Sequence, residues 1–378
     1  MNILQLTAHY YPNVGGVETH LSDLVLGLSK NGYEISVLTY NPLTTKAKAR
    51  TLERQKNVFI FRIPWFRGLF YRLVDKPALE FIYLFPGLFV VSPFVIVSKK
   101  IDVIHAHGLV AGAVAVIWGR ILGKRVVVAT HSIYDFPKSG AYRRFVQWIF
   151  HSAGHVLCLS NQSKKEIVQL GISENKVSVF TYWINQDVFK KNMKAKKILH
   201  WEKMQSIVLF VGRLVKEKGV RILLDASIRF DPGISLVLAG VGPLESEVRE
   251  AAKKNNEIMY LGNISQADLP LYYSASSLLI VPSVHEEGFG RVILEALSCG
   301  LPVIAANRGG IKEALNSSIG ELIEINKENI AKRVNALIKN PQRRNALAQN
   351  GIAFVKRHYS ESNINTIIQS YGKNVTLS

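Results

Sequence analysis

Cysteine is scarce in this chain: its 378 residues include only two, Cys158 and Cys299, and both lie in apolar runs far apart in the sequence. That scarcity excludes a small fold held together by disulfides and favours a reduced, cytosolic setting. The sequence also has no Cys-x-x-Cys pair and no histidine-rich spacing of the kind that binds zinc. We therefore expect neither a disulfide nor a structural metal ion.

Acidic residues are also few, with 28 Asp and Glu against 47 Lys and Arg, which gives a formal net charge of +19. This excess favours an anionic partner, either nucleic acid, a membrane surface or a phosphorylated substrate. The chain enters an apolar run at residues 3–6 with no basic segment before it, so we expect no signal peptide. Its length and its 48% hydrophobic content fit two domains with sizeable cores.

One part of the first half is basic and aromatic, and the next part has no charge at all. Residues 44–76 hold nine Lys and Arg against two acids, and residues 81–98 have no charge but contain Pro86 and Pro93. The uncharged run is short for a membrane span and is interrupted twice by proline. Two interpretations stay open: an anchor at an anionic membrane surface, or a buried helix and loop of the first domain. The aromatic residues of the basic part are Phe59, Phe61, Trp65, Phe66, Phe70 and Tyr71.

The two halves of the chain begin alike. Residues 3–7 read as a strand, residues 9–16 as a glycine-containing loop, and the one-faced apolar stripe that starts at Val17 as a helix before a strand at 35–39. The second half repeats this order with a strand at 207–211, a loop at 212–219 and a helix at 220–230. Further strands are expected at 103–105, 125–129, 155–159, 177–180, 235–239, 258–261, 278–282, 301–305 and 319–323.

Repeated strand–helix–strand units predict an α/β protein of two Rossmann-like, doubly wound domains facing across a cleft. A lysine-rich break marks the expected boundary, and a long basic helix is expected around 341–371. The expected division is a first domain at 1–190, a linker at 191–205, a second domain at 206–355 and a terminal helix at 356–378.

The most informative segment is residues 285–304, HEEGFGRVILEALSCGLPVI. Glu287 and Glu295 lie on either side of a Gly-Phe-Gly turn that follows a buried strand, and a helix is expected to begin near Gly290 or Arg291. Carboxyl ends of parallel strands are where open α/β sheets bind ligands, and a helix N-terminus there favours phosphate.

This segment resembles the E-x7-E signature of glycosyltransferase family 4, the retaining nucleotide-sugar-dependent transferases with the GT-B architecture. The resemblance covers nearly the whole chain and is strongest at 207–310. It implies a second domain that binds the donor, a first domain that binds the acceptor, and a terminal helix that returns to the first domain. It also implies that Glu295 binds the ribose and that Glu287 meets hydroxyls of the donor sugar. The backbone amides of the helix start, at Gly288, Phe289, Gly290 and Arg291, would add hydrogen-bond donors.

Cations and glycines suited to a diphosphate occur in both halves. Arg213 and Lys218 lie in the loop GRLVKEKG right after a strand, where Arg can hold phosphate in a bidentate way and Lys adds a point charge. The pattern also resembles the phosphate-binding Arg and Lys of the family. Gly15 and Gly16 precede a helix, so their amides can approach a phosphate closely, and the family has a similar motif facing the donor.

Histidines follow two strands of the first half. His131 comes after the strand at 125–129 and resembles the active-site histidine of the family, which meets the donor sugar. The alternative is a hydrogen-bonded core histidine. His107 is expected to line the cleft, with His105 on the same face of its strand but deeper. Tyr10, in the first loop, is a further candidate for the acceptor side.

The chain departs from the family pattern in two loops. Residues 181–185 read Thr-Tyr-Trp-Ile-Asn where members often have Pro-Asn-Gly-Val-Asp, and 240–243 lack the Asp often found between the glycines. The first difference weakens any acceptor assignment that depends on that loop.

The sequence thus predicts a retaining glycosyltransferase that needs no cofactor and no metal, since it has no Asp-x-Asp motif and cationic side chains can replace the metal. The basic-aromatic segment favours a lipid or lipid-linked glycan as acceptor, with residues 44–98 on an anionic membrane and the protein peripheral on the cytoplasmic face. The alternatives are a transferase with a soluble acceptor, a sugar-nucleotide epimerase or phosphorylase of the same architecture, and a nucleic-acid-binding protein. The last is disfavoured because no nucleic-acid module is recognisable and the acids of the cleft would repel a backbone.

Overall fold

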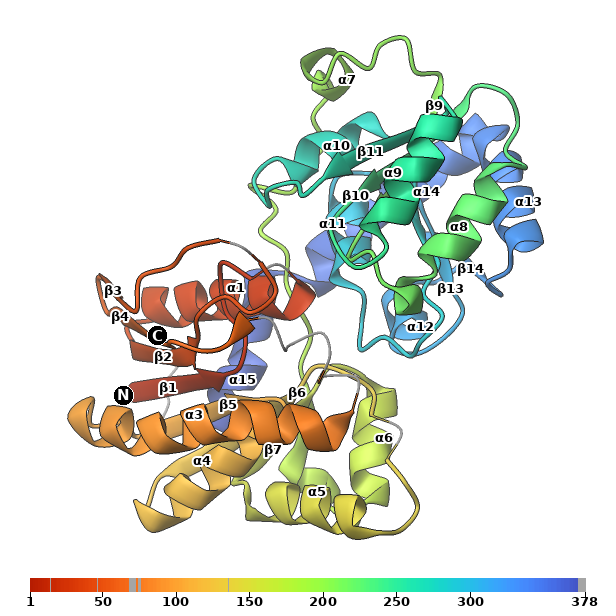
Figure 1. The fold of residues 1–378 in the computed structure, drawn as a ribbon. Coiled ribbons are helices and arrows are strands. Elements are labelled where there is room, and N and C mark those ends of the chain that lie inside the picture. The colour runs from red at the N-terminus through yellow and green to blue at the C-terminus, as the bar shows by residue number, and fades with distance from the viewer. Residues whose placement is uncertain (14, 46, 68–72, 74–75, 135, 373–378) are drawn as a thin grey trace. The chain divides into compact units, whose positions relative to one another are not determined.

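A computed structural model describes the whole chain except residues 14, 46, 68–72, 74–75, 135 and 373–378. The chain divides into two compact units, one formed by residues 1–181 with 363–378 and the other by residues 182–362. Each unit has a parallel sheet with helices packed on it (Figure 1). The prediction of two doubly wound α/β domains is therefore confirmed.

The first unit contains an eight-stranded sheet in the order β3-β4-β2-β1-β5-β6-β7-β8, parallel except for the pair β3–β4. Helices α3, α4 and α5 form one layer, and α1 packs with α15 (Figure 1). The strands are β1 Asn2–Thr7, β2 Glu34–Tyr40, β3 Leu52–Gln55, β4 Val58–Ile63, β5 Val103–His107, β6 Arg125–Thr130, β7 His155–Cys158 and β8 Val177–Val179. The helices are α1 Gly16–Lys30, α3 Pro77–Ser98, α4 Leu109–Ile121, α5 Ala141–Ser152, α6 Asn161–Gln169 and α15 Ile364–Ser370.

The second unit contains a six-stranded sheet, all parallel, in the order β11-β10-β9-β12-β13-β14. Its strands are β9 Ser206–Val211, β10 Ile234–Ala239, β11 Ile258–Gly262, β12 Leu278–Val281, β13 Val303–Ala306 and β14 Gly320–Ile323. Its helices are α7 Ala195–Ile198, α8 Val220–Ser227, α9 Glu245–Lys254, α10 Leu269–Ala275, α11 Arg291–Ser298, α12 Ile311–Ala314, α13 Lys327–Ile338 and α14 Pro341–His358. Strands β9, β10, β12 and β13 are almost fully buried, which is why they read as continuous apolar runs in the sequence.

Two predicted boundaries differ from the structure. Residues 191–205 are not a linker, because this lysine-rich stretch belongs to the second unit and buries Ala195 and Trp201. The helix expected around 341–371 is interrupted: α14 ends at His358, and the chain re-enters the first unit at Asn363 rather than at residue 356. The backbone carbonyl of Tyr359 accepts a hydrogen bond from the amide of Ile184, at 3.0 Å, instead of continuing a helix.

The basic-aromatic segment contains a hairpin that the sequence prediction missed. Strand β4 pairs parallel with β2, and β3 pairs antiparallel with β4. Phe59 of β4 lies under two cations, with Lys99 Nζ 3.5 Å and the Arg54 guanidinium 4.8 Å from its ring centroid. Part of the cation–aromatic pattern therefore serves packing within this domain. Phe70 and Tyr71 of the predicted anchor lie outside the described residues.

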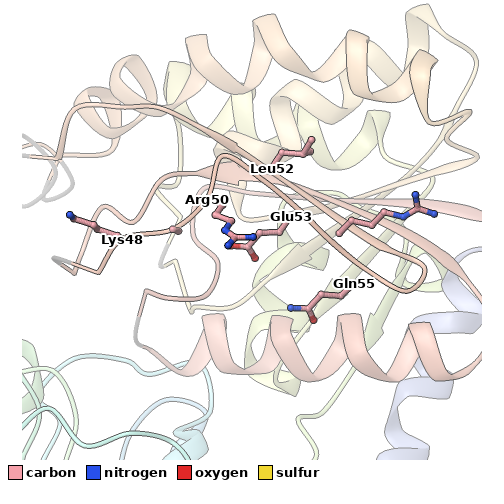
Figure 2. Close-up of a pocket in the computed structure, with 7 residues that line it drawn as sticks. Lys48, Arg50, Leu52, Glu53 and Gln55 are labelled. Carbon is pink, nitrogen blue, oxygen red and sulfur yellow. The ribbon is translucent and has the colours of Figure 1, made fainter.

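An open hollow lies beside β3, and it is lined by residues 48–50 and 52–55 (Figure 2). Charges of both signs surround it, and Glu53 also pairs with the buried Arg62 at 3.0 Å. None of the residues predicted for catalysis or binding lines this hollow.

The uncharged run at 81–98 forms one continuous helix, α3, in spite of Pro86 and Pro93. The Tyr40 hydroxyl donates a hydrogen bond to the carbonyl of Leu84 and accepts one from the amide of Leu88, so it bridges the helix around Pro86. The expectation that two prolines break this segment was wrong, because groups from outside the helix compensate for them.

Pro93 is compensated in a similar way. It cannot donate to the carbonyl of Phe89, and that carbonyl accepts instead from Trp118 Nε1 of α4 at 2.9 Å. Residues Ala78–Ser98 are long and apolar enough to cross a membrane by length and composition, with a mean hydropathy of 2.1, and 39% of this stretch is buried. A core helix of a soluble protein passes the same test of length and composition.

Candidate functional site

Three loops meet at the carboxyl ends of adjacent strands in the second unit. They are residues 212–219 after β9, 282–290 after β12 and 307–310 after β13. The first two are tied together by a hydrogen bond of 2.8 Å from the amide of Val284 to the carbonyl of Glu217. Gly219, at a φ of 69°, allows this approach, because a Cβ there would lie 1.9 Å from the carbonyl oxygen of Pro282. The loop at 212–219, which is expected to bind phosphate, is thus packed directly against the loop that carries Glu287.

Glu287 forms the central contact of these loops. Its Oε1 accepts a hydrogen bond from Lys218 Nζ at 2.7 Å and another from the Ser283 hydroxyl, and the residue is 7% exposed. Burial pushes the pKa of Glu287 upward, but the charge of Lys218 and the bonds from Lys218 and Ser283 outweigh it, so the pKa lies below its usual value. Glu287 is therefore a buried, ionised carboxylate, and Lys218 is its counter-ion.

The third loop lies directly on the backbone beside Glu287. The amide of Gly310 donates to the carbonyl of Glu287 at 2.8 Å. A Cβ at Gly310 would lie 1.8 Å from the carbonyl oxygen of Gly288, so only glycine fits. This close packing fixes the position of the Gly-Phe-Gly turn.

Glu295, the second acid of the signature, is 3% exposed and held by three donors. Arg291 Nε and Gln266 Nε2 donate to its Oε1 at 3.0 and 2.7 Å, and the Tyr273 hydroxyl donates to its Oε2 at 2.9 Å. A carboxylate has about four lone-pair sites, so one more donor can be accepted. The sequence prediction missed Gln266 and Tyr273, since nothing in their local pattern connects them with residue 295.

The other residues of this unit that were predicted to bind the nucleotide-sugar donor differ in exposure. Arg213 is exposed, and its side chain makes no hydrogen bond or ion pair with any residue that the structure describes, so its guanidinium is available to a ligand. Helix α11 begins at Arg291 after Gly290, as predicted. The Phe289 ring is buried against Tyr182 and Tyr359, so this residue can offer a ligand only its backbone.

In the first unit the structure brings His107 and His131 together. His107 Nδ1 lies 3.0 Å from His131 Nε2, and their rings are stacked with centroids 5.2 Å apart. His105 lies deeper, at 1% exposure against 6% for His107, which confirms their expected order. Burial lowers the pKa of both His105 and His131 to about 3. These imidazoles are therefore neutral at physiological pH.

The glycines and the tyrosine of the first loop lie near the start of α1. Gly15 precedes the helix, and a Cβ there would lie 2.3 Å from a carboxylate oxygen of Glu18, so the Glu18 side chain folds back over the helix N-terminus. Gly16 is the first residue of the helix. Tyr10 is 6% exposed, and burial raises its pKa to about 12. Little of the Tyr10 ring is thus left for contact with an acceptor.

The described residues hold no group of three or more His, Cys, Asp or Glu that could bind a metal ion. Cys158 and Cys299 are both buried and do not form a disulfide.

Comparison with known proteins agrees with this geometry. Residues 14–187 match the family described as Glycosyltransferase Family 4, and residues 191–371 match the family described as Glycosyl transferases group 1. Together the two matches span nearly the whole chain. Both halves of the chain are therefore glycosyltransferase domains, one similar to each family. An uncharacterized glycosyltransferase of Methanocaldococcus jannaschii is 29% identical over 358 residues, which are 92% of each chain.

Other relatives and solved structures extend this similarity. The gpi3 subunit of the phosphatidylinositol N-acetylglucosaminyltransferase of Schizosaccharomyces pombe is 22% identical over 87% of this glycosyltransferase and 71% of its own length. Anabaena HepE in complex with UDP superposes with a TM-score of 0.77 at 22% identity, covering 97% and 98% of the two chains. Sucrose-phosphate synthase of Thermosynechococcus elongatus superposes with a TM-score of 0.82 at 21% identity, covering 98% of each of the two chains. These likenesses confirm the predicted GT-B fold.

Proposed function

We propose that this glycosyltransferase moves a sugar from a nucleotide-sugar donor to an acceptor hydroxyl with retention of the anomeric configuration. The observation that carries the proposal is the ion pair between Lys218 and the buried Glu287 in the loops at the carboxyl ends of β9 and β12. The Arg213 side chain, which has no partner among the described residues, lies in the same β9 loop. A diphosphate needs cations and amides, and a sugar needs carboxylates that accept from its hydroxyls. These loops offer both kinds of group.

Each residue then has a role. Arg213 and Lys218 bind the diphosphate and stabilise the charge that develops on it as the glycosidic bond breaks. Glu287 accepts hydrogen bonds from the sugar, and Glu295 accepts one from the ribose through its remaining lone pair. The amides at the start of α11 add donors. His131 and the glycines Gly15 and Gly16 meet the donor from the first domain. The leaving diphosphate removes the acceptor proton on the same face, so no second carboxylate is needed as base.

The donor class rests on chemistry and on a structural neighbour. Anabaena HepE has been crystallised with UDP and with UDP-glucose, and its fold is shared by this chain. We propose a nucleotide diphosphate sugar as donor and catalysis without a divalent metal, since Arg213 and Lys218 can supply the positive charge that a metal would bring. The transfer rate is expected to be the same within a factor of about two in EDTA as in magnesium. A rate that EDTA abolishes and manganese restores would contradict this role of Arg213 and Lys218.

For the acceptor we propose a lipid or lipid-linked glycan at an anionic membrane surface. The support is a stripe on α3 whose members are exposed and apolar: Ile82, Pro86, Val90, Phe94 and Val97. Their spacing of three and four residues places them on one face of the helix. Ile82, Val90, Phe94 and Val97 are 60–71% exposed. A contiguous apolar face on a protein of net charge +19 fits an anionic bilayer. The proposal places the protein on the cytoplasmic face, as a peripheral protein.

Binding to vesicles tests this stripe. The protein is expected to float with vesicles that contain phosphatidylserine at low salt, and Val90→Gln/Phe94→Gln is expected to lower the bound fraction at least about fivefold, because two apolar side chains no longer enter the interface. The matched control is Ile228→Gln, which changes a side chain that is 74% exposed in the second unit. Equal flotation of the stripe variant and the control would exclude α3 as the membrane contact.

The proposed reaction is tested by transfer itself. Incubation with labelled UDP-, GDP- and ADP-sugars and a lipid extract should give labelled lipid, and NMR of the product should show the donor's anomeric configuration. Label only in water-soluble product would favour the soluble-acceptor alternative. An epimerised donor without transfer would favour the epimerase.

A further inference from the structure

A chain of buried hydrogen bonds in the first unit links His131 to Tyr371, which follows α15 at the other end of the sequence. From His131 Nε2 it runs 3.0 Å to His107 Nδ1, and from His107 Nε2 it runs 2.7 Å to Gln5 Oε1. Gln5 Nε2 then lies 3.4 Å from the Tyr371 hydroxyl, which is 2.8 Å from His105 Nδ1. Gln5, His105, His107 and Tyr371 are each at most 6% exposed. Water therefore cannot readily replace any of these bonds.

In this series of hydrogen bonds, the donor and the acceptor of each bond between Gln5, His107 and His131 can be assigned in turn. An amide oxygen only accepts, so His107 Nε2 must carry the proton in its bond to Gln5 Oε1. Burial lowers the pKa of His107 well below its usual value, so the ring is neutral and has only that one N–H. Its Nδ1 must then accept from His131 Nε2–H. Since His131 is also neutral, its own Nδ1 carries no proton.

The orientation of the Gln5 amide is what selects this arrangement. If the amide were turned over, its NH2 would face His107, and both histidines would hold their protons on the other nitrogen. In the orientation that the structure shows, the Gln5 NH2 donates to the Tyr371 hydroxyl, and the proton of that hydroxyl is left for His105 Nδ1. Removing that hydroxyl removes the partner of the Gln5 NH2 in this orientation.

Nδ1 of His131 is a buried acceptor, and no donor among the described residues lies within hydrogen-bond distance of it. A buried polar atom without a partner is costly and points to a ligand that supplies one. We propose that Gln5 and Tyr371 are positioning residues that hold His131 as the Nε2–H tautomer, so that its Nδ1 accepts from a substrate hydroxyl. The substrate part of this inference rests on the proposed transferase function; the tautomer does not.

NMR of the ring nitrogens in protein labelled with 15N-histidine tests the tautomer without any substrate. The His131 signals are assigned by their loss in His131→Asn. In the wild type, Nδ1 of His131 should be unprotonated and Nε2 protonated. In Tyr371→Phe and in Gln5→Leu the two tautomers should mix, and the transfer rate should fall about tenfold, as for other residues that orient an active-site histidine.

The matched control is Tyr40→Phe, which removes a buried tyrosine hydroxyl elsewhere in the same unit. It should leave the His131 signals unchanged. A protonated Nδ1 in the wild type, or an unchanged tautomer in both Tyr371→Phe and Gln5→Leu, would overturn the inference. The predicted tautomer in a protein that transfers no sugar would leave the hydrogen-bond chain standing and remove the proposed function.

Discussion

Lys218→Ala is expected to lower kcat/KM for sugar transfer by about 100- to 1000-fold, the range found when one preorganised donor to a developing negative charge is removed. Two effects act together. The diphosphate loses a cation, and Glu287 keeps its charge in a buried place without its counter-ion. An unpaired buried carboxylate repels the phosphate and destabilises the loop. Steady-state kinetics with the preferred donor measures the loss.

Arg213→Ala separates these two effects. The Arg213 side chain is exposed and has no partner among the described residues. Its removal should therefore lower kcat/KM by a similar factor, while the melting temperature stays at the wild-type value. Lys218→Ala, by contrast, should lower both kcat/KM and the melting temperature. The matched control is Lys216→Ala, an exposed lysine of the same loop, which should change kcat/KM by less than about threefold. Wild-type kinetics in Arg213→Ala would remove the phosphate role of this loop.

Mild acid is expected to unfold the first unit before the second. Burial lowers the pKa of His105 and His131 to about 3 and that of His107 well below its usual value, whereas an unfolded histidine has a pKa of about 6.5. Between these values the unfolded chain binds more protons than the folded one, so stability falls as the pH falls. Each histidine contributes about 1.4 kcal/mol per pH unit in this window. At pH 5.5 the three together should cost about 4 kcal/mol relative to pH 7.

Amide hydrogen exchange of peptides from β5 and β6, corrected for the intrinsic pH effect, measures this loss in the first unit alone. His105→Asn should reduce the pH dependence by about one third, because one of the three groups no longer titrates. His151→Asn, which changes an exposed histidine on α5, should leave it as in the wild type. A stability that does not change between pH 7 and 5.5 would show that these histidines are not held neutral.

The sequence predicted those parts of the molecule that depend on local pattern. Buried parallel strands read as apolar runs, and the helix that starts after Gly290 was placed correctly by its glycine and apolar stripe. What it missed depends on contacts between distant segments. Helix α3 continues past Pro86 because Tyr40 of β2 bridges it, and Glu295 is held by Tyr273, 22 residues away. No local pattern contains either contact.

In the candidate site, too, the local patterns were predicted and the contacts between distant segments were missed. The loop GRLVKEKG and the E-x7-E segment could be found by their glycines and charges, but the direct pairing of Lys218 with Glu287 spans 69 residues. The hydrogen bond between Gln5 and Tyr371 spans 366 residues. Strands β3 and β4 were missed for a different reason: their cations and aromatics resembled a membrane anchor, and the pairing of Lys99 with Phe59 became visible only in the folded sheet.

The central claim is that the loops of the second unit bind a nucleotide diphosphate through Arg213 and Lys218, without a metal. Isothermal titration of the wild type and Arg213→Ala with UDP-, GDP- and ADP-sugars in EDTA tests it most directly. The wild type should bind one of these donors at one site, and Arg213→Ala should bind it at least about tenfold more weakly, a loss of about 1.4 kcal/mol. Equal affinity in the two proteins, or binding that appears only when a divalent metal is added, would contradict the claim.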